Sequence, residues 1–588
     1  MSEEKTTKQI LEEKLAKVEK KRTPLYNPEA LKKIKESFEQ WQNTVVPEKD
    51  RENWEVTPHT ISGSEVPREL LYTPLNNPDF DYEKDLNFSG SEPFTRGIHP
   101  NMYRGRLFTI RQLFGAGSPE YINKRMKMLL EHGATGTNWA LDLATVQMYD
   151  SDEPEALGQV GTVGVPIDCV EDMGVICRDI PIDKISASIV THYPRNTAIT
   201  LPMYLVMAER RGISWDKLAG SAQNDFIMEN LVRSALEYIP PKDDFRIMCD
   251  NIEFIRKNVP QWNYVTLNGY NLREWGTSGV TEMAVAVANG IAILQEMLKR
   301  GQDVDWVAPR LAFFWAPASD FFEEVARIRA VRRLWYKIVK YRFEAKNPRS
   351  MWMRCHVQTS GISLTREEPL NNIVRAAYQA LAAVLGGVQS LHVDSYDEAY
   401  SVPSEEASLI SLRTQQIIEA ETQVTQVADP LGGSFYVEAL TNEYEKRMLD
   451  EVDEIERMGG IVNVVTSGWL HNKVARRIQQ EQRMIADGEI KIVGRNYFRD
   501  PNQKLPEVWV HEYDENLGKA MRDKLARLRM RRDNEKVNQT LKALKDTCLG
   551  GGNVMAACVE CARADATKGE MRQVFEEAFG KWKPPIYV

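Results

Sequence analysis

The sequence has few cysteines, no excess of positive charge and no long apolar run, and each absence excludes a class of protein. Seven cysteines in 588 residues are too few for the disulfide framework typical of small secreted domains. A net charge of −9 argues against a general nucleic-acid-binding protein, because phosphate neutralisation requires a basic face. No apolar run approaches the ~20 residues that span a bilayer, and the first residues lack the apolar core of a signal peptide. We therefore expect a cytoplasmic protein.

The short motifs of several enzyme classes are also missing. The sequence contains no H-E-x-x-H, no G-x-x-x-x-G-K-[ST] and no G-x-G-x-x-G after a predicted strand. Cys558 and Cys561 form a single C-x-x-C without a second pair, for which packing is a simpler explanation than metal or redox chemistry. We expect no metal site, and a metal-dependent barrel hydrolase is disfavoured because no His/Asp/Glu ligand set is found at the predicted strand ends.

Three regions differ in composition. Residues 1–90 begin with a charged helix pattern and continue rich in Pro, Asn, Asp and Glu, which predicts an extended arm that contacts its own barrel or a partner subunit. Residues 91–430 alternate between strand-like and helical runs. Residues 431–588 are helical and charged. The basic stretch 515–547 predicts one amphipathic helix or a helix pair, for which a solvated face is favoured over a membrane or nucleic-acid surface.

The alternation in the middle region predicts a parallel sheet, and the number of strands favours a (β/α)8 TIM barrel. The strand-like runs are TGTNWALDL (135–143), KISASIVTH (184–192), NYVTLNGY (263–270), RLAFFWAP (310–317), SMWMRCHVQTS (350–360) and VQSLHVDSY (388–396). Amphipathic helices are predicted between them, for example over 280–299 and 318–342. The predicted class is therefore α/β, with an extended N-terminal arm and a helical C-terminal region.

Several predicted strands carry polar side chains at alternate positions, where barrel interiors usually carry Val, Ile and Leu. An outward-facing polar side is a weak explanation, because helices cover parallel barrel strands from outside. Buried polar groups are costly unless they are hydrogen-bonded, so this pattern predicts a polar thread or water along the barrel axis. The side chains concerned are Ser186, Ser188, Thr191, Asn263, Thr266, Asn268, His356, Gln358, Ser360, Ser390 and His392.

The segment TRGIHPNMYRGRLFTIRQLFGAGS (95–118) combines arginines, aromatic residues and a glycine-rich end. Arg104, Arg106 and Arg111 supply planar guanidinium groups that match phosphate oxygens. Aromatic rings beside them can cover an adenine or a thin acyl chain. The residues alone leave two interpretations open, a groove for a phosphate-bearing ligand and a solvated basic loop, and we favour the groove.

This segment closely resembles the coenzyme A-binding stretch of the large subunits of cobalamin-dependent acyl-CoA mutases, the family of methylmalonyl-CoA and 2-hydroxyisobutyryl-CoA mutase. Further segments extend the resemblance in the family's order: AQNDFIMENLVRSALEYIPP (222–241), LNGYNLREWG (267–276), APRLAFFW (308–315), RCHVQTSGISLT (354–365) and QSLHVDSYDEA (389–399). Together they cover residues 90–500 nearly continuously. The resemblance implies that the pantetheine arm of coenzyme A passes down the barrel axis between small polar side chains.

The resemblance also implies roles for single residues. The residues implied to line the coenzyme A channel are Met102, Arg106, Thr109 and Arg111, with Arg310 as a further phosphate contact. The residues implied to line the acyl pocket and orient the thioester carbonyl are Gln223, Tyr270 and Asn271. The residues implied to meet the corrin ring of adenosylcobalamin, where the strands end, are His356, Gln358, Glu398 and Ala399.

Three positions bear on the acyl group. Arg233 matches the family's arginine that holds the free carboxylate of methylmalonyl-CoA, and it favours a dicarboxylic acyl-CoA over a salt bridge to Glu229. Leu113 stands where the family has a tyrosine that packs against the substrate, and Asn271 stands where it has a histidine bonded to the thioester carbonyl. Both exchanges remove ring volume, so we expect an acid bulkier than methylmalonate, such as a branched alkylmalonyl-CoA or an alkyl- or aryl-substituted succinyl-CoA.

The family's cobalt-ligating signature, D-x-H-x-x-G, is absent, and none of the eight histidines has its spacing. We therefore expect a separate small subunit to hold adenosylcobalamin in a hetero-oligomer built on a dimer of large subunits, with a GTPase chaperone as a candidate further partner. No membrane or nucleic-acid partner is expected.

The expected activity is a radical 1,2-rearrangement of the carbon skeleton of an acyl-CoA. Two alternatives remain open: a mutase-like, non-catalytic subunit that binds coenzyme A or a partner, and a methylmalonyl-CoA mutase proper.

Overall fold

The computed structural model describes residues 5–232, 239–500, 502, 514–583 and 585, and the side chains of Leu113, Phe114, Glu229 and Val232 are outside the described set. The strands are short: β1 (Glu55–Val56), β2 (Arg68–Glu69), β3 (Thr109–Ile110), β4 (Leu113–Phe114), β5 (Gly136–Ala140), β6 (Ser186–Val190), β7 (Ala219–Ala222), β8 (Trp262–Asn263), β9 (Val265–Asn268), β10 (Leu311–Trp315), β11 (Arg354–Gln358) and β12 (Ser390–His392).

Two five-stranded sheets are connected where β3 continues into β4 and where β8 continues into β9. Their strand orders are β3-β12-β11-β10-β9 and β4-β5-β6-β7-β8, and every pairing within them is parallel. Only Arg111 and Gln112 separate β3 from β4, and only Tyr264 separates β8 from β9. The two sheets are therefore joined edge to edge, and their strand segments follow one another in chain order around a ring. This is the pairing expected of a TIM-barrel-like domain, and the predicted α/β class with a parallel sheet is confirmed.

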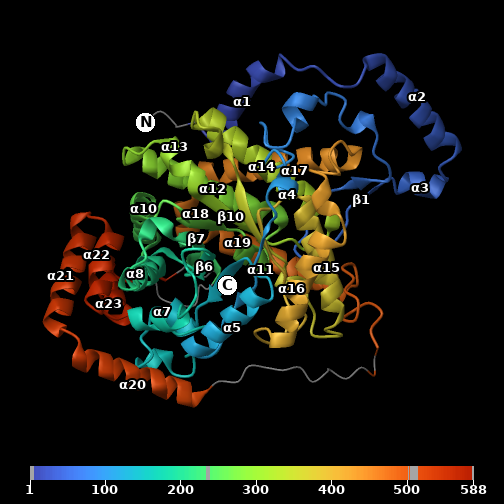
Figure 1. Cartoon of the computed structure of the whole chain (residues 1–588). Helices are drawn as coiled ribbons and strands as arrows, with labels where there is room; N and C mark the ends of the chain where they lie inside the picture. The colour runs from blue at the N-terminus through green and yellow to red at the C-terminus, as the bar shows by residue number, and fades with distance from the viewer. Residues whose placement is uncertain (1–4, 233–238, 501, 503–513, 584, 586–588) are drawn as a thin grey trace.

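Helices follow the strands and surround the ring (Figure 1). The longer ones are α5 (Pro119–Glu131), α8 (Pro194–Arg210), α10 (Pro241–Asn258), α12 (Gly279–Lys299), α14 (Phe321–Lys337), α15 (Asn371–Leu385) and α16 (Glu405–Ala420). Shorter ones are α4 (Met102–Gly105), α6 (Leu143–Val146), α7 (Val170–Ile176), α9 (Phe226–Val232), α11 (Tyr270–Trp275) and α13 (Val304–Val307). The helices predicted over 280–299 and 318–342 correspond to α12 and to α14 with the turn of π-helix that follows it.

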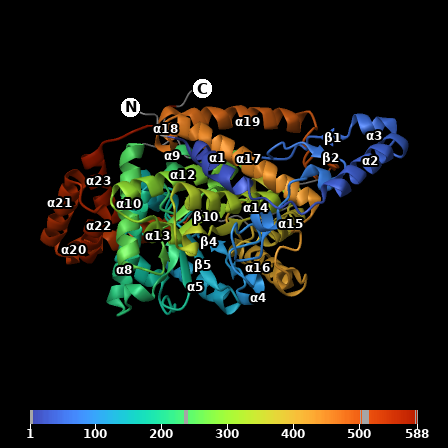
Figure 2. The same ribbon diagram turned by 90° about the horizontal axis from the view of Figure 1, so that it is seen from above.

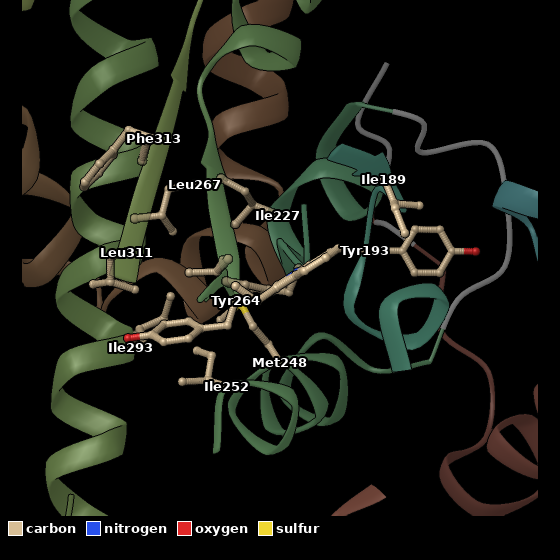
Figure 3. Close-up of a cluster of buried hydrophobic side chains, with 14 of the residues drawn as sticks. Ile189, Tyr193, Ile227, Met248, Ile252, Tyr264, Leu267, Ile293, Leu311 and Phe313 are labelled. Carbon is tan, nitrogen blue, oxygen red and sulfur yellow. The ribbon is translucent and has the colours of Figure 1, made fainter. Parts of the chain in front are cut away.

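The hydrophobic core lies between the ring and these helices, because the strands alternate. Leu311, Phe313 and Trp315 of β10 are buried in the core, whereas Ala312 and Phe314 face the cavity inside the ring. Figure 3 shows the core side chains packed between strands and helices, and the labelled members are Ile189, Tyr193, Ile227, Met248, Ile252, Tyr264, Leu267, Ile293, Leu311 and Phe313. Successive side chains of a strand thus point alternately to the core and to the interior of the ring.

The N-terminal region is more helical than the sequence predicted. It contains α1 (Thr7–Glu19), α2 (Pro28–Thr44) and α3 (Glu48–Glu52). α2 begins with Asn27 as N-cap and Pro28 at its first position, which are common signals of a helix start. It has no buried residue, and Figures 1 and 2 show α2 and α3 projecting from the body of the molecule.

The C-terminal region consists of α17 (Phe435–Arg457), α18 (Ile461–Ser467), α19 (Trp469–Ala486), α20 (Glu515–Arg531), α21 (Asn534–Gly550), α22 (Val554–Arg563) and α23 (Lys568–Phe579). The basic stretch 515–547 forms a helix pair, because α20 ends at Arg531 and α21 begins at Asn534 with Asp533 as its N-cap. The last four helices pack beside α8, on the side opposite to α2 and α3 (Figures 1 and 2).

Two further observations concern the chain as a whole. Among the described helices, none has an apolar stretch long enough to cross a membrane. All seven cysteines are free and buried, and Cys558 and Cys561 both lie on α22. Burial raises the pKa of both thiols above the usual range, so packing accounts for this C-x-x-C.

Candidate active site

A cavity of about 810 Å³ runs along the inside of the ring. It reaches from Arg106 and Arg310, before the amino ends of β3 and β10, to Tyr270 and Gln358, at the carboxyl ends of β9 and β11. Most of the site residues predicted from the sequence line it: Met102, Arg106, Thr109, Arg111, Gln223, Tyr270, Asn271, Arg310, His356, Gln358 and Glu398.

Three predicted residues are not placed there. Arg233 and the side chain of Leu113 lie outside the described residues. Ala399 is half-buried in the loop after β12 and does not line the cavity. Its implied contact with the corrin ring stays a prediction.

The polar strand faces predicted from the sequence do form the cavity wall. The residues concerned that line it are Ser186, Ser188, Asn263, Thr266, His356, Gln358 and Ser390. Thr191, Asn268, Ser360 and His392 were also expected on this wall but do not line it. They follow the strands or end them, where the chain leaves the alternation of the sheet, and their side chains bond within the protein instead, as Ser360 does to Glu274 over 2.7 Å.

The amino end of the cavity gathers arginines around an indole ring. Arg106, Arg310, Arg349 and Arg354 line it together with Trp352. The guanidinium carbons of Arg354 and Arg349 lie 5.3 and 5.8 Å from the centre of the Trp352 ring. Sequence reasoning missed Arg349 and Arg354, although Arg354 is the first residue of β11 and shares the alternation of His356 and Gln358.

No carboxylate in the described part of the chain forms an ion pair with any of these four arginines. Burial, together with repulsion from Arg310 and Arg349, lowers the pKa of Arg354 to about 10. Burial and Arg256 likewise lower the pKa of Arg310. Arg310 and Arg354 are partly buried, whereas Arg106 and Arg349 are exposed. Uncompensated positive charge on the partly buried pair is costly in the free protein, and a polyanionic ligand would neutralise it.

Arg111 crosses the ring between β3 and β6. Its Nε donates to the Oγ of Ser390 over 3.0 Å, and its Nη2 donates to the Oγ of Ser186 over 2.8 Å. Its Nη1 donates to the carbonyl of Thr137 over 3.0 Å. Burial lowers its pKa to about 10. A cation held only by neutral acceptors keeps its charge available to a ligand in the cavity.

Two amides at the carboxyl end are oriented by neighbouring groups. The Oε1 of Gln223 accepts from the backbone N–H of His192 over 3.0 Å, and the Oδ1 of Asn271 accepts from the Nδ2 of Asn268 over 2.8 Å. Both side chains line the cavity, and no hydrogen bond to another described residue engages their amide nitrogens. An N–H donor of each amide is therefore available to a ligand in the cavity.

An aromatic stack forms one wall between these amides and Arg111. The rings of Tyr270 and Phe314 stack at 4.8 Å, and those of Phe314 and His356 at 4.9 Å. The Nδ1 of His356 lies 2.9 Å from the Oγ of Ser390, and its buried Nε2 has no partner among the described groups. Burial and the charge of Arg111 lower the pKa of His356 far below its usual value, so the imidazole is neutral.

Buried carboxyl groups gather at the carboxyl end. Gln358 donates from its Nε2 to the hydroxyl of Tyr270 and to the Oδ1 of Asp394, over 2.8 Å in each case. Burial and mutual repulsion raise the pKa of Glu274 to about 8, and burial raises that of Asp394 to about 8. Burial and repulsion from Asp394 raise the pKa of Glu398, on the cavity wall, well above its usual value. Sequence reasoning named Gln358 and Glu398 but missed Glu274 and Asp394, which lie behind the lining residues.

An apolar wall faces these groups at the same end. We use this name for Leu141, Leu143, Val146 and Val163, which all line the cavity. Leu141 lies in the turn after β5, Leu143 and Val146 lie in α6, and Val163 lies in the loop that follows. The sequence analysis did not single them out. The carbonyl of Val146 accepts from the hydroxyl of Tyr193, and the backbone N–H of the preceding residue, His192, donates to Gln223.

The His, Cys, Asp and Glu side chains in and around the cavity are the candidate metal ligands. Within the described residues, no group of three or more His, Cys, Asp or Glu side chains is arranged to hold a metal ion. The cavity combines instead a cationic end, a polar middle and an end with amides, carboxyl groups and an apolar wall.

Known proteins are similar to this chain over most of its length. The family model described as methylmalonyl-CoA mutase matches residues 59–581. The chain is 40% identical over 532 residues to the 2-hydroxyisobutanoyl-CoA mutase large subunit of Aquincola tertiaricarbonis, covering 90% of this chain and 93% of that protein. It is 39% identical over 527 residues to the methylmalonyl-CoA mutase of Rhizobium meliloti, covering 89% and 72% of the two chains. With the human mitochondrial methylmalonyl-CoA mutase it shares 37% identity over 528 residues, or 89% and 69% of the two chains.

Proposed function

Because the chain belongs to the methylmalonyl-CoA mutase family, whose acyl-CoA mutases are isomerases, we propose that it catalyses an adenosylcobalamin-dependent 1,2-rearrangement of the carbon skeleton of a dicarboxylic acyl-CoA bulkier than methylmalonyl-CoA. The observation that carries this proposal is the continuous cavity of about 810 Å³ with a cationic end and an amide-bearing end. A nucleotide-tailed thioester has the matching order of groups, with phosphates at one end and an acyl thioester at the other.

The cationic end suits the phosphates of coenzyme A. Arg310 and Arg354 lie there without carboxylate partners among the described residues, and their guanidinium groups match phosphate oxygens. The ring of Trp352 offers a face on which an adenine can stack. Binding of the anion would relieve the repulsion that lowers the pKa of Arg354.

The acyl end suits a carbonyl that two donors hold in one orientation. The Nε2 of Gln223 and the Nδ2 of Asn271 would donate to the thioester oxygen, and Tyr270 would cover the acyl group with its ring face. Such fixed donors stabilise charge that develops on an oxygen during a reaction. They also align the reacting carbons, since the thioester is held at both ends of the cavity.

The apolar wall supports an acyl group that carries an apolar branch. Leu143, Val146 and Val163 line the cavity and have apolar side chains. Asn271 is smaller than the histidine that the resemblance places there, which leaves room for the branch. Arg233 would bind the free carboxylate, since a guanidinium in a dry pocket needs an anionic partner.

The carboxyl-end residues fit the corrin ring of adenosylcobalamin. The amide side chains of a corrin are hydrogen-bond donors, and the Oδ2 of Asp394 and the Oδ1 of Asp397 are buried acceptors without a partner among the described groups. Gln358, Glu398 and the Nε2 of His356 would complete the contact. When bound, this cofactor supplies the radical chemistry that removes a hydrogen atom from the acyl group and returns it. The chain's own residues would exclude water and keep the thioester in place.

A separate small subunit is the proposed holder of the cofactor. The relative that this chain matches over 93% of its length is named a large subunit, whereas the chain matches 72% and 69% of two methylmalonyl-CoA mutases. No histidine of the chain has the D-x-H-x-x-G spacing. We extend to this chain the large-subunit role, with cytoplasmic assembly and a GTPase chaperone as further parts of the proposal.

Reconstitution tests this proposal. The full chain is mixed with a cobalamin-binding small subunit and adenosylcobalamin, and a panel of mono- and dicarboxylic acyl-CoA esters is followed by product analysis and electron paramagnetic resonance. We expect turnover and a radical signal with a branched dicarboxylic ester. Binding of coenzyme A esters without any radical signal would support the non-catalytic alternative, and a preference for methylmalonyl-CoA would support a methylmalonyl-CoA mutase proper.

The substitution Arg233→Gln tests the carboxylate. Loss of one partner of a desolvated charge pair costs several kcal/mol, so kcat/KM for the dicarboxylic ester should fall by about 100-fold, with a much smaller effect on a monocarboxylic ester. Arg527→Met, on the exposed face of α20, is the control for the loss of one positive charge. An equal loss on both esters would remove the argument for a carboxylate.

A further inference from the structure

We propose that the C-terminal helices α20–α23 hold the apolar wall of the acyl pocket in position, and that Lys568 is the positioning residue through which they do so. The proposal rests on the proposed function, because it assigns this helical region to the choice of acyl group. Lys568 and its partners Thr145 and Asp168 do not line the cavity. The sequence analysis assigned them no role, and they are not among the proposed coenzyme A contacts.

Lys568 is the first residue of α23 and is 1% exposed. Its Nζ donates to the Oγ1 of Thr145 over 3.0 Å and forms an ion pair with the Oδ1 of Asp168 over 2.9 Å. Its backbone N–H also donates to the carbonyl of Asp168 over 3.0 Å. A lysine is almost never this buried unless it is paired, so the side chain ties α23 to a specific place in the barrel.

That place is the segment that carries the apolar wall. Thr145 lies in α6 between Leu143 and Val146, and both neighbours line the cavity while Thr145 itself is buried behind them. The N-cap of the same helix, Asp142, accepts from the backbone N–H of Thr145 over 2.8 Å and from that of Gly161 over 2.8 Å. The wall therefore depends on side-chain hydrogen bonds, because α6 is a single turn with little stability of its own.

α20 supports the same segment through apolar contacts. Met521 packs in a cluster with Ala144 and Val160, and Leu517 lies against this cluster. A Cβ on Gly161 would lie 2.4 Å from the Cδ2 of Leu517, so the helix and the loop approach each other as closely as a glycine allows. Both α20 and α23 thus contact the segment 142–168.

The consequence is a link between the C-terminal helices and acyl selectivity. A pocket wall discriminates by size only if it resists displacement, and one methylene then changes kcat/KM by roughly 10–200-fold. With Lys568 engaged, Leu143 and Val146 are fixed by a buried ion pair on a separate helix. Without it, the one-turn helix α6 would yield to smaller or larger acyl groups, and the discrimination would fall.

Matched variants of Thr145 and Lys568 test this link in the full chain. Thr145→Val removes the acceptor for Lys568, whereas Thr145→Ser keeps the hydroxyl. The double variant Lys568→Met with Asp168→Asn removes both charges of the ion pair, so neither partner is left buried without the other. Lys545→Met is the control, since Lys545 pairs with Glu577 on the exposed side of the same helices over 2.8 Å.

Two measurements are made on each folded variant. Hydrogen–deuterium exchange of the peptide covering 141–168 should become about tenfold faster in Thr145→Val and in the double variant, and stay unchanged in Thr145→Ser and Lys545→Met. Calorimetric dissociation constants for a series of acyl-CoA esters that differ by one methylene should show size discrimination reduced by about tenfold in the same two variants. Unchanged exchange, or faster exchange with unchanged discrimination, would overturn the proposal.

The proposed reaction and the positioning role of Lys568 can be contradicted independently. If the reconstituted protein converts no ester but the affinities and exchange change as expected, the proposed reaction is wrong and the positioning role stands. If turnover is found and Thr145→Val retains the full discrimination, the positioning role is wrong and the proposed reaction stands. If no acyl-CoA ester binds at all, both are wrong.

Discussion

The side chain of Asn268 donates to the Oδ1 of Asn271 over 2.8 Å, and the backbone N–H of Asn271 donates back to the Oδ1 of Asn268 over 3.0 Å. This reciprocal pair fixes the amide plane of Asn271 at the start of α11 and directs its Nδ2 to the cavity. The position that the resemblance gives to a histidine is therefore occupied here by a preoriented donor that stays neutral over the whole physiological pH range.

Asn271→Ala should lower kcat/KM by about 100-fold, because removal of one preorganised donor to a reacting oxygen typically costs 10²–10³ in rate. The effect should appear mainly in kcat and not in KM if the bond strengthens as the reaction proceeds. Steady-state kinetics of the reconstituted complex measure both constants. Asn258→Ala, on α10 outside the ring, is the control, since the Nδ2 of Asn258 donates to the carbonyl of Phe254 of the same helix over 2.7 Å. A rise in KM alone would mean that Asn271 contributes to binding only.

The arginines at the amino end predict a conflict between stability and binding. Arg354→Met removes a buried cation whose pKa burial and neighbouring arginines lower to about 10, so the free protein should melt at a higher temperature. The same change should weaken coenzyme A by at least about tenfold, because a charge-assisted phosphate contact is lost. Pantetheine, which has no such phosphates, should bind almost unchanged. Calorimetry with both ligands and thermal melting distinguish this from a general loss of structure, which would lower the melting temperature and both affinities.

Much of the ring was predictable because its strands carry a strong period of two. The runs around Ser186, Leu311 and Arg354 were predicted as strands and form β6, β10 and β11. β7 was missed, because AGSA (219–222) has no β-branched or large residue. Its small side chains are a packing requirement that only the neighbouring strands reveal. α2 was missed although Leu31, Ile34, Phe38 and Trp41 recur at helical spacing and Asn27 caps its start, because the Pro, Asn, Asp and Glu content of the surrounding arm favoured an extended structure.

Glu274 predicts a specific pH dependence of stability. Burial and Asp394 raise its pKa to about 8 in the folded protein, whereas an unfolded glutamate titrates near 4.3. Between these values the folded state binds more protons than the unfolded state, so the free energy of unfolding falls as pH rises from about 4.3 to about 8 and then levels off. Glu274→Gln removes this titration, and its Oε1 and Nε2 can still bond the backbone N–H of Ile362 and the Oγ of Ser360. The melting temperature of the variant should therefore decline less between pH 5 and 8 than that of the wild type.

The control for this prediction is Glu253→Gln on α10. Its carboxylate is in a partly exposed pair with Arg300 at 3.2 Å, so its removal should leave the slope of melting temperature against pH close to that of the wild type. Equal slopes for the wild type and Glu274→Gln would show that Glu274 is ionised in the folded protein at neutral pH.

The site was predictable where residues face the cavity and unpredictable where they act from behind it. Arg106, Gln223 and Tyr270 belong to segments with unusual composition, and the structure places all three on the wall. Glu274 and Lys568 were not found, because a charged residue in a helix normally faces solvent. Only the tertiary packing shows that these two are buried and what they bond.

The glycine of β7 predicts the cost of changing a strand that the sequence did not reveal. A Cβ on Gly220 would lie 2.2 Å from the carbonyl oxygen of Ala187 and 2.5 Å from the ring of Trp262. Both neighbours are held in place, since the first is backbone of β6 and the second is 1% exposed. Gly220→Ala should therefore destabilise the protein by roughly 3 kcal/mol, as overpacking of a well-packed core does, and should shift Ser221 on the cavity wall. Gly174→Ala in α7 is the matched control, because nothing lies within 4 Å of its added Cβ and alanine is favoured over glycine inside a helix. Urea denaturation of both variants measures the difference, and equal midpoints would mean that β6 and β7 can separate to admit a methyl group, contrary to the tight ring described above.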